Sequence, residues 1–113
     1  MSWKDAEYCI KRWQGPFALK GLMSVEDAKK PVDIGASAIM LSNHGGRQLD
    51  GSRSPFDQLP AIVDAVGGKI EIIVDGGIRR GTHVLKALAL GATACSFGKG
   101  FLFATRRRRV NQV

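Results

Sequence analysis

The chain repeats one pattern of hydrophobic and polar positions four times: a short apolar run, then a segment whose apolar positions have helical spacing. The apolar runs lie in "FALKG" (17–21), "SAIMLS" (37–42), "IEIIVD" (70–75) and "TACSFG" (93–98). Because these runs are nearly unbroken rather than alternating, they indicate parallel strands covered on both faces. The repeat therefore predicts an α/β fold of about four strand–helix units.

The segments after the runs carry the signals of helices. Ser24 is expected to cap the first of these helices. Pro31 is expected to interrupt that helix or to mark its end, because a proline inside a helix costs on the order of 3 kcal/mol. The second helix would bury an apolar face made of Leu59, Ile62, Val63 and Val66. For the third helix, Thr82 is predicted as the N-cap and Gly91 as the residue just beyond the end.

Polar or glycine-rich residues follow each apolar run, at the point where each predicted strand ends. These clusters are Lys20, Ser42–Gly46, Asp75–Gly77 and Gly98–Lys99. Functional residues of (β/α)8 barrels and of doubly wound sheets collect at the carboxyl ends of parallel strands. Four units correspond to half of such a barrel, so the clusters are expected to share one edge of a half-barrel.

Two of the strand-end clusters have the composition of a phosphate site. "VDGGIRRG" (74–81) joins an acid, two glycines and two arginines, and "FGKG" (97–100) repeats the theme in the next unit. Backbone N–H groups of such turns bind phosphate, and an arginine can clamp it through two hydrogen bonds. Each turn could be only a tight connection, but their occurrence in consecutive units favours phosphate binding. Neither a dinucleotide GxGxxG nor a P-loop GxxxxGK[ST] occurs.

The net charge of +7 arises largely from one short segment. Four of the positive charges form the run Arg106–Arg109, which leaves +3 for the rest of the chain. We expect residues 1–104 to form one partial barrel domain and residues 105–113 to form a basic, disordered tail. Because no aromatic residues are interleaved with the arginines, a solvated chain end is favoured over nucleic-acid binding.

Cysteine spacing and hydropathy argue against several further classes of protein. Cys9 and Cys95 lie far apart, with no CxxC pair and no histidine at metal-ligand spacing, so two reduced thiols and no metal site are predicted. No stretch reaches the roughly 20 apolar residues that span a bilayer, and the N-terminus has no secretory signal. The expected location is the cytoplasm, and peripheral contact with the inner face of the membrane stays open.

Four strings carry a resemblance to a known family: "LKG", "SNHGGRQLDG", "DGGIRRGTHVLKALALGA" and "FGKGFLFA". In this order and spacing they closely resemble the carboxyl-terminal half of the FMN-dependent α-hydroxy-acid dehydrogenases and oxidases, over about residues 3–104. The resemblance implies the second half of a TIM (β/α)8 barrel, FMN as cofactor, and oxidation of an L-2-hydroxy acid to the 2-oxo acid. The opening "SWKDAEYCIKRWQGPFALKGLMSVEDA" is most similar to the L-lactate dehydrogenase branch, so L-lactate is the expected substrate.

The resemblance assigns the catalytic step to the string after the second strand. His44 matches the family's base, and a histidine can take a proton and later release it near neutral pH. Arg47 matches the arginine that binds the substrate carboxylate, and its planar fork would hold two oxygens at once. A base paired with a carboxylate clamp suits a 2-hydroxy acid.

Residues at the other strand ends match flavin contacts of the family. Lys20 matches a lysine beside the N1 and C2 carbonyl of the flavin, where negative charge gathers on reduction. The other cofactor-binding matches are Ser42, Asp75, Gly77, Arg79, Gly98 and Lys99. Lys99 stands where the family commonly has arginine, so its hold on phosphate is expected to be weaker.

The chain lacks the family's first four strand–helix units, and "TRRRRVNQV" after Ala104 does not resemble the family's continuation. Two alternatives therefore stay open: a truncated, catalytically inactive half-barrel that binds flavin or phosphate weakly, and a flavin-free barrel isomerase or synthase. The expected partners are a small 2-hydroxy acid and an electron acceptor, which could be a quinone, a cytochrome or oxygen. The full-length family is expected to form homo-oligomers.

Overall fold

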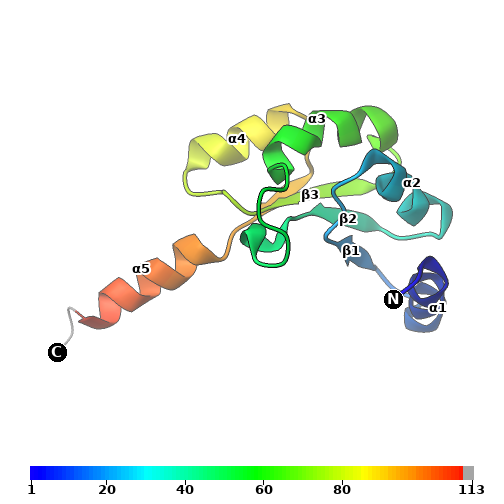
Figure 1. Cartoon of the computed structure of the whole chain (residues 1–113), viewed down its shortest axis with the longest axis horizontal. Helices are drawn as coiled ribbons and strands as arrows, with labels where there is room; N and C mark the ends of the chain where they lie inside the picture. Colours follow the sequence, from blue (N-terminus) through cyan, green and yellow to red (C-terminus); the bar gives the residue numbers. More distant parts are fainter. Residues whose placement is uncertain (111–113) are drawn as a thin grey trace.

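The computed structural model describes residues 1–110 of the chain, with side chains through residue 106. Its sheet has four parallel strands, β1 (Ala18–Lys20), β2 (Ala38–Leu41), β3 (Glu71–Asp75) and β4 (Ala94–Ser96). The helices of the described residues are α1 (Trp3–Trp13), α2 (Val25–Asp33), the short 3-10 turn η1 (His44–Gly46), α3 (Pro55–Val66), α4 (Gly81–Ala89) and α5 (Lys99–Val110). The strands are ordered β1-β2-β3-β4 as in the sequence (Figure 1), which confirms the predicted half-barrel arrangement.

One face of the sheet is covered and the other is open. Helices α2, α3 and α4 lie on the covered face (Figure 1) and bury side chains that alternate along the strands. These side chains include Ile39, Leu41, Ile72 and Val74, none more than 1% exposed. Their strand neighbours Met40 and Ile73 point to the open face and are half-buried. The expected cover on both faces of the strands is therefore present on one face only.

The described chain begins with a helix that the strand–helix repeat did not predict. At the start of α1, the Ser2 hydroxyl accepts a hydrogen bond from the Asp5 N–H, and the Asp5 carboxylate accepts one from the Ser2 N–H. This capping box satisfies backbone groups that the first turn leaves free. Ser24 caps α2 through its side chain, as predicted.

Two other helix features differ from the sequence prediction. Thr82 is not the N-cap of α4, because Arg80 holds that position without a side-chain hydrogen bond and the helix begins at Gly81. Pro31 lies inside α2 and is buried. The helix ends two residues later, at Asp33, so only the last part of α2 depends on the backbone bond that proline cannot make.

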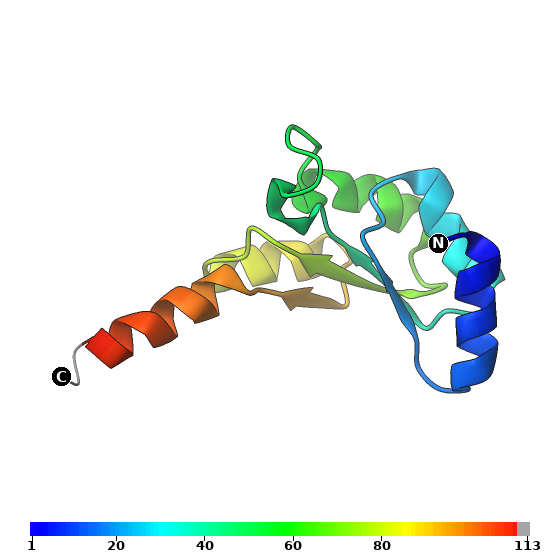
Figure 2. The same ribbon diagram turned by 60° about the horizontal axis from the view of Figure 1, so that its bottom comes forward.

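Helix α5 leaves the sheet at the end of β4 and projects away from the rest of the molecule (Figures 1 and 2). It runs through Val110, so the segment predicted as a disordered tail is helical up to that residue, while residues 111–113 lie outside the described part. Arginine is a good helix former, and no glycine or proline follows Gly100 to end the helix. Among residues 1–110, no helix has the length and apolar character needed to cross a bilayer.

Candidate functional site

The carboxyl ends of the strands open onto a cavity of about 1170 Å³. Most of the predicted site residues line it, namely Lys20, His44, Asp75, Gly77, Arg79, Gly98 and Lys99. Ser42 does not line the cavity, but it is buried and donates a hydrogen bond to Asp75, which does. Arg47 does not line the cavity either. Four separate parts of the sequence therefore meet at one edge of the sheet, as the strand-end pattern predicted.

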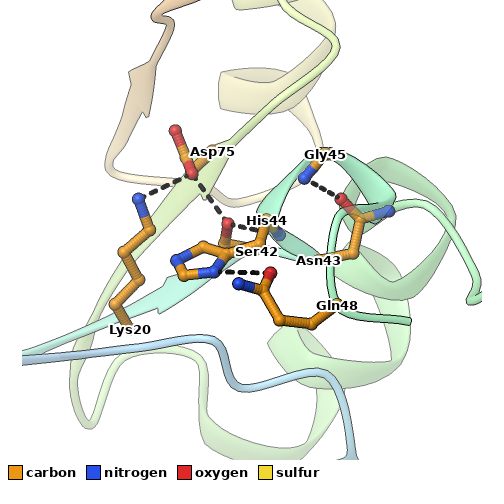
Figure 3. Close-up of polar contacts among 7 residues, drawn as sticks. All are labelled: Lys20, Ser42, Asn43, His44, Gly45, Gln48 and Asp75. Carbon is orange, nitrogen blue, oxygen red and sulfur yellow. Dashed lines mark hydrogen bonds and ion pairs between the residues drawn. The ribbon is translucent and has the colours of Figure 1, made fainter. Parts of the chain in front are cut away.

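The side chains of Lys20, Ser42 and Asp75 form a polar cluster at three neighbouring strand ends (Figure 3). Asp75 Oδ2 lies 3.0 Å from Lys20 Nζ and accepts a 2.7 Å hydrogen bond from the Ser42 hydroxyl. The lysine and the aspartate share the open face, because Lys20 is in register with Met40 and, through it, with Ile73, two residues before Asp75. The ion pair holds the Lys20 ammonium at the cavity, while 47% of its side chain stays exposed.

The surroundings of Asp75 favour its ionised form. Partial burial alone would raise the pKa of Asp75, but hydrogen bonds from Ser42, Lys20 and Ser96 and the charge of Lys20 outweigh it. The pKa of Asp75 therefore lies below its ordinary value of 3.8. Because the charged carboxylate joins the ends of β1, β2 and β3, its ionisation is linked to the stability of the sheet.

We expect Asp75→Asn to destabilise the chain at neutral pH and to flatten the dependence of its stability on pH in acid. A carboxyl group with a lowered pKa stabilises the folded state above its ordinary pKa of 3.8, and this contribution is lost as the pH falls through the lowered value. Urea unfolding followed by circular dichroism, between about pH 2 and pH 7, measures the effect. The exposed Asp64→Asn is the matched control. If both variants kept the parental profile, the cluster would not stabilise the fold.

The turn η1 brings His44 to the cavity in a left-handed backbone conformation, with a φ of 56°. The Ser42 hydroxyl accepts a 3.2 Å hydrogen bond from the His44 N–H (Figure 3). The Asn43 side chain accepts one of 3.0 Å from the Gly45 N–H. Gln48 Oε1 lies 2.9 Å from His44 Nδ1, so the tautomer with its hydrogen on Nδ1 can donate a hydrogen bond to this amide oxygen. In that tautomer, Nε2 has a lone pair that can take a proton.

Arg47 follows this turn directly, at the C-cap of η1, and its side chain is exposed. The structure thus brings His44, but not Arg47, to the cavity. The joint action of the two residues on one substrate stays a prediction. Sequence reasoning also missed Gln48, because the left-handed turn at His44, Gly45 and Gly46 that brings the two side chains together is not visible in the residue pattern.

The glycine turns after β3 and β4 expose their backbone to the cavity. A Cβ atom at Gly76, Gly77 or Gly98 would meet no atom within 4 Å outside the neighbouring residues. Gly76 and Gly77 also have φ values of 102° and 72°, a region that side chains rarely adopt. A bound group can therefore approach these backbone N–H groups closely.

Besides Lys20 and His44, four further basic side chains border the same cavity: Arg79, His83, Lys86 and Lys99. His83 Nδ1 accepts a 3.3 Å hydrogen bond from the Arg79 N–H and so joins the turn to the start of α4. Lys99 Nζ lies 3.5 Å from the position of a Cβ atom at Gly45, so the turn after β4 reaches the turn that carries His44. Sequence reasoning missed His83, although "RRGTH" places it four residues after Arg79.

The described residues show neither a disulfide bond nor a cluster of ligands for a metal ion. Cys9 and Cys95 are free thiols, and partial burial raises the pKa of the Cys95 thiol. Within residues 1–110, no group of three or more His, Cys, Asp and Glu side chains could hold a metal.

A family model described as "FMN-dependent dehydrogenase" matches residues 1–111 of the chain. Among characterised relatives, the pre-mycofactocin synthase of Mycolicibacterium smegmatis is 50% identical over 102 residues, which cover 90% of this chain and 26% of the relative. The L-lactate dehydrogenase of Vibrio cholerae is 51% identical over 104 residues, which cover 92% of this chain and 28% of the relative. The chain therefore spans about a quarter of the length of these relatives.

Solved structures show the same relationship. A mandelate oxidase with benzoyl-formic acid superposes on this chain with a TM-score of 0.82 and 49% sequence identity. The superposition covers 86% of this chain and 29% of the oxidase. A Y128F mutant of mandelate oxidase with (S)-mandelic acid gives the same TM-score of 0.82 over the same shares of both chains. The four-stranded sheet is thus a segment of the barrel in these proteins.

Proposed function

Because the chain belongs to the FMN-dependent dehydrogenase family, we propose that its strand-end cavity is part of an FMN site that oxidises an L-2-hydroxy acid to the 2-oxo acid. Relatives are named for lactate and for mandelate, and both compounds are 2-hydroxy acids. L-Lactate is the substrate that we propose first. The observation that carries the proposal is the meeting of Lys20, His44 and the glycine turns at Gly77 and Gly98 around one cavity.

The residues of the cavity fit FMN in charge, shape and polarity. FMN joins a planar aromatic ring system to a dianionic phosphate. Arg79 and Lys99 provide cations for the phosphate, and the open backbone at Gly77 and Gly98 provides room for close approach. An apolar lining suited to an aromatic ring comes from Phe56, Ile78, Phe97 and Phe103.

In the proposed reaction, each group of the chain has one task. Bound FMN would supply the acceptor for the two electrons and one of the two protons that the substrate loses. The Lys20 ammonium lies 3.0 Å from the Asp75 carboxylate. It would stabilise the negative charge that gathers on the flavin on reduction. His44 would take a proton at Nε2, since Gln48 contacts Nδ1. Arg47 would bind the substrate carboxylate after its exposed side chain turns toward the cavity.

The proposal also covers the extent of the domain and the fate of the electrons. Residues 1–104 would form the barrel portion of the protein. A quinone, a cytochrome or oxygen would take the electrons from the site. These three acceptors are distinguished by which of them restores the oxidised spectrum after L-lactate has been added.

Two observations favour a second candidate, a half-barrel that binds flavin weakly and does not turn over substrate by itself. The chain spans 26% to 28% of its relatives, and one face of its sheet is open. An FMN ring bound in the cavity would therefore meet protein on one side and solvent on the other. The two candidates differ in whether the site residues of this chain bind FMN and oxidise a 2-hydroxy acid once the rest of a barrel is present.

We expect the isolated chain to hold FMN weakly and the same chain to hold it tightly within a complete barrel. In the test, this chain replaces the matching 104-residue segment of the Vibrio cholerae L-lactate dehydrogenase, with the parental enzyme as control. After incubation with excess FMN and desalting, the visible spectrum should show stoichiometric flavin in the chimera and little in the isolated chain. Anaerobic L-lactate should then bleach the flavin of the chimera.

Two results would contradict these expectations. Stoichiometric yellow protein from the isolated chain would show that the half-barrel alone completes the flavin site. A chimera that retains FMN but is bleached by no 2-hydroxy acid, while the parental enzyme is bleached, would refute the proposed reaction for this chain.

A further inference from the structure

We propose that His83 is a further residue of the flavin site, and that its ring donates a hydrogen bond from Nε2 to the phosphate of FMN. This inference rests on the proposed function, because it needs the cofactor that the family uses. Neither the sequence motifs nor the resemblance assigned a role to His83. Three observations carry the inference: a contact of the ring with the turn after β3, its place at the cavity, and the charges around it.

The ring of His83 is held by the glycine turn beside it. The turn after β3 leads directly into α4 (Figure 1), where His83 is the third residue. The Arg79 N–H donates a 3.3 Å hydrogen bond to His83 Nδ1. A backbone N–H can only donate, so Nδ1 carries no hydrogen while this contact is made, and the hydrogen of the neutral ring is on Nε2. His83 therefore offers a donor at a known atom.

This donor belongs to a side chain that borders the cavity. His83 is half-buried and is one of the residues that line the cavity. Among the hydrogen bonds of residues 1–106, the ring takes part through Nδ1 and not through Nε2. An N–H donor that is partly withdrawn from water is stabilised when an acceptor reaches it. A ligand in the cavity would supply that acceptor.

The charges around His83 favour an anion as the ligand. Lys86 lies three residues later on α4 and also lines the cavity, so the two side chains share one side of the helix. Asp75 is the only acid among the described residues that border the cavity, and it is paired with Lys20. Basic groups at the cavity therefore outnumber acids, and they attract a ligand with negative charge.

The place of His83 in the fold selects the phosphate among the anions of the proposed reaction. The turn that His83 contacts contains Gly77, where a Cβ atom would meet no atom within 4 Å outside the neighbouring residues. The substrate carboxylate is instead assigned to Arg47, which follows the turn after β2. A phosphate at the Gly77 turn would meet backbone N–H groups, the Arg79 guanidinium and the His83 ring together.

The first turns of other helices show what a purely local role at this position requires. The third residue is an aspartate in α1, α2 and α3, namely Asp5, Asp27 and Asp57. An acid there interacts favourably with the positive end of the helix. Helix α4 has no acid in its first turn. His83 accepts the Arg79 N–H, as a carboxylate could, and it adds a donor that an ionised carboxylate lacks.

The flavin affinity of the chimera with the Vibrio cholerae enzyme tests this role. In His83→Asn, the shorter amide can accept the Arg79 N–H near the position of Nδ1, but it does not reach the position of Nε2. We expect this variant to raise the Kd for FMN about tenfold, because a hydrogen bond to a charged group is lost. The Kd for riboflavin, which has no phosphate, should change by less than about twofold. Titrations followed by flavin fluorescence measure both constants.

Two further variants of the chimera are the controls. The longer amide of His83→Gln can place a donor near the position of Nε2, so this variant should lose less FMN affinity than His83→Asn. Gln14→Asn, at the exposed end of α1, should bind both flavins as the parent does. An unchanged Kd for FMN in His83→Asn would overturn the inference. An equal loss for riboflavin, or an equal loss in His83→Gln, would overturn it as well.

Bleaching of the flavin by L-lactate is scored separately in the same proteins. A parental chimera that binds FMN but is not bleached refutes the proposed reaction, while the ratio of the FMN and riboflavin constants still reports on His83. Normal bleaching with an unchanged ratio in His83→Asn refutes the contact with phosphate and leaves the proposed reaction in place.

A second measurement needs no flavin. The chain has two histidines, His44 and His83, so NMR of the imidazole nitrogens in the isolated chain gives two sets of signals, which His44→Gln assigns. At about pH 8, an unperturbed histidine is neutral and phosphate is mainly a dianion. Nε2 of His83 should then carry the hydrogen, and inorganic phosphate should shift its signal to saturation, whereas sodium chloride of equal ionic strength should not. A hydrogen on Nδ1, or equal shifts with phosphate and chloride, would overturn the inference.

Discussion

In the chimera with the Vibrio cholerae enzyme, His44→Gln is expected to leave FMN bound and to slow flavin reduction by L-lactate by about 10²-fold or more. Glutamine keeps the approximate size of histidine and can form hydrogen bonds, but it cannot take a proton at the position of Nε2. The residues proposed to bind the phosphate of FMN, which include Arg79 and Gly98, are unchanged in this variant. The visible spectrum should therefore stay that of bound flavin. Anaerobic stopped-flow absorbance gives the reduction rate directly.

Arg47→Lys provides the contrast, because it keeps the positive charge and loses the planar fork. This variant should lower both the apparent affinity for L-lactate and the reduction rate, since the substrate is held less firmly and is less well oriented. Arg12→Lys, on the exposed surface of α1, is the matched control and should behave as the parent. A His44→Gln chimera that reduces its flavin at the parental rate would show that this histidine is only structural.

Leu59→Ala is expected to remove about 2–5 kcal/mol from the free energy of unfolding. Leu59 is fully buried between α3 and the sheet, so truncation would leave a cavity in the only covered face among the described residues. Small domains have about 5–15 kcal/mol in total, so this loss is a large share. Urea unfolding of the isolated chain, followed by circular dichroism, measures it.

Leu49→Ala is the matched control for that experiment, because it makes the same change at a side chain that is 69% exposed. Its effect should stay within about 0.5 kcal/mol. If the two variants lost equal stability, the layer between α2–α4 and the sheet would not be the core of the molecule.

The meeting of the strand ends could be predicted from the sequence, because parallel strands place their carboxyl ends at one edge whatever the loops between them do. Lys20, His44 and Asp75 therefore converge as expected. The direction of the Arg47 side chain could not be predicted. It depends on the left-handed backbone at His44 and Gly45, which turns the chain between the base and the arginine.

Two further features of the fold, the open face of the sheet and helix α1, could not be predicted from the hydropathy of the strands alone. The open face of the sheet carries Met40 and Ile73, whose apolar character is the same as that of side chains on the covered face. Whether such residues are covered depends on partners outside the strands, which the pattern within a strand does not report. For α1, in contrast, the sequence itself contains the capping signal, because Ser2 is followed three residues later by Asp5.

The sequential order of the strands has a consequence for local opening. Each strand is hydrogen-bonded only to the strands of adjacent units, so fraying can begin at β1 or β4 while β2 and β3 stay paired. Lys20 ends β1 and Lys99 follows β4, so two of the proposed cofactor contacts lie on the two outermost units, while Ser42, Asp75, Gly77 and Arg79 lie on the inner ones. A ligand that contacts both Lys20 and Lys99 would link the two outermost strands of the sheet. Part of its binding free energy would then be measured as slower amide hydrogen exchange in the outer strands.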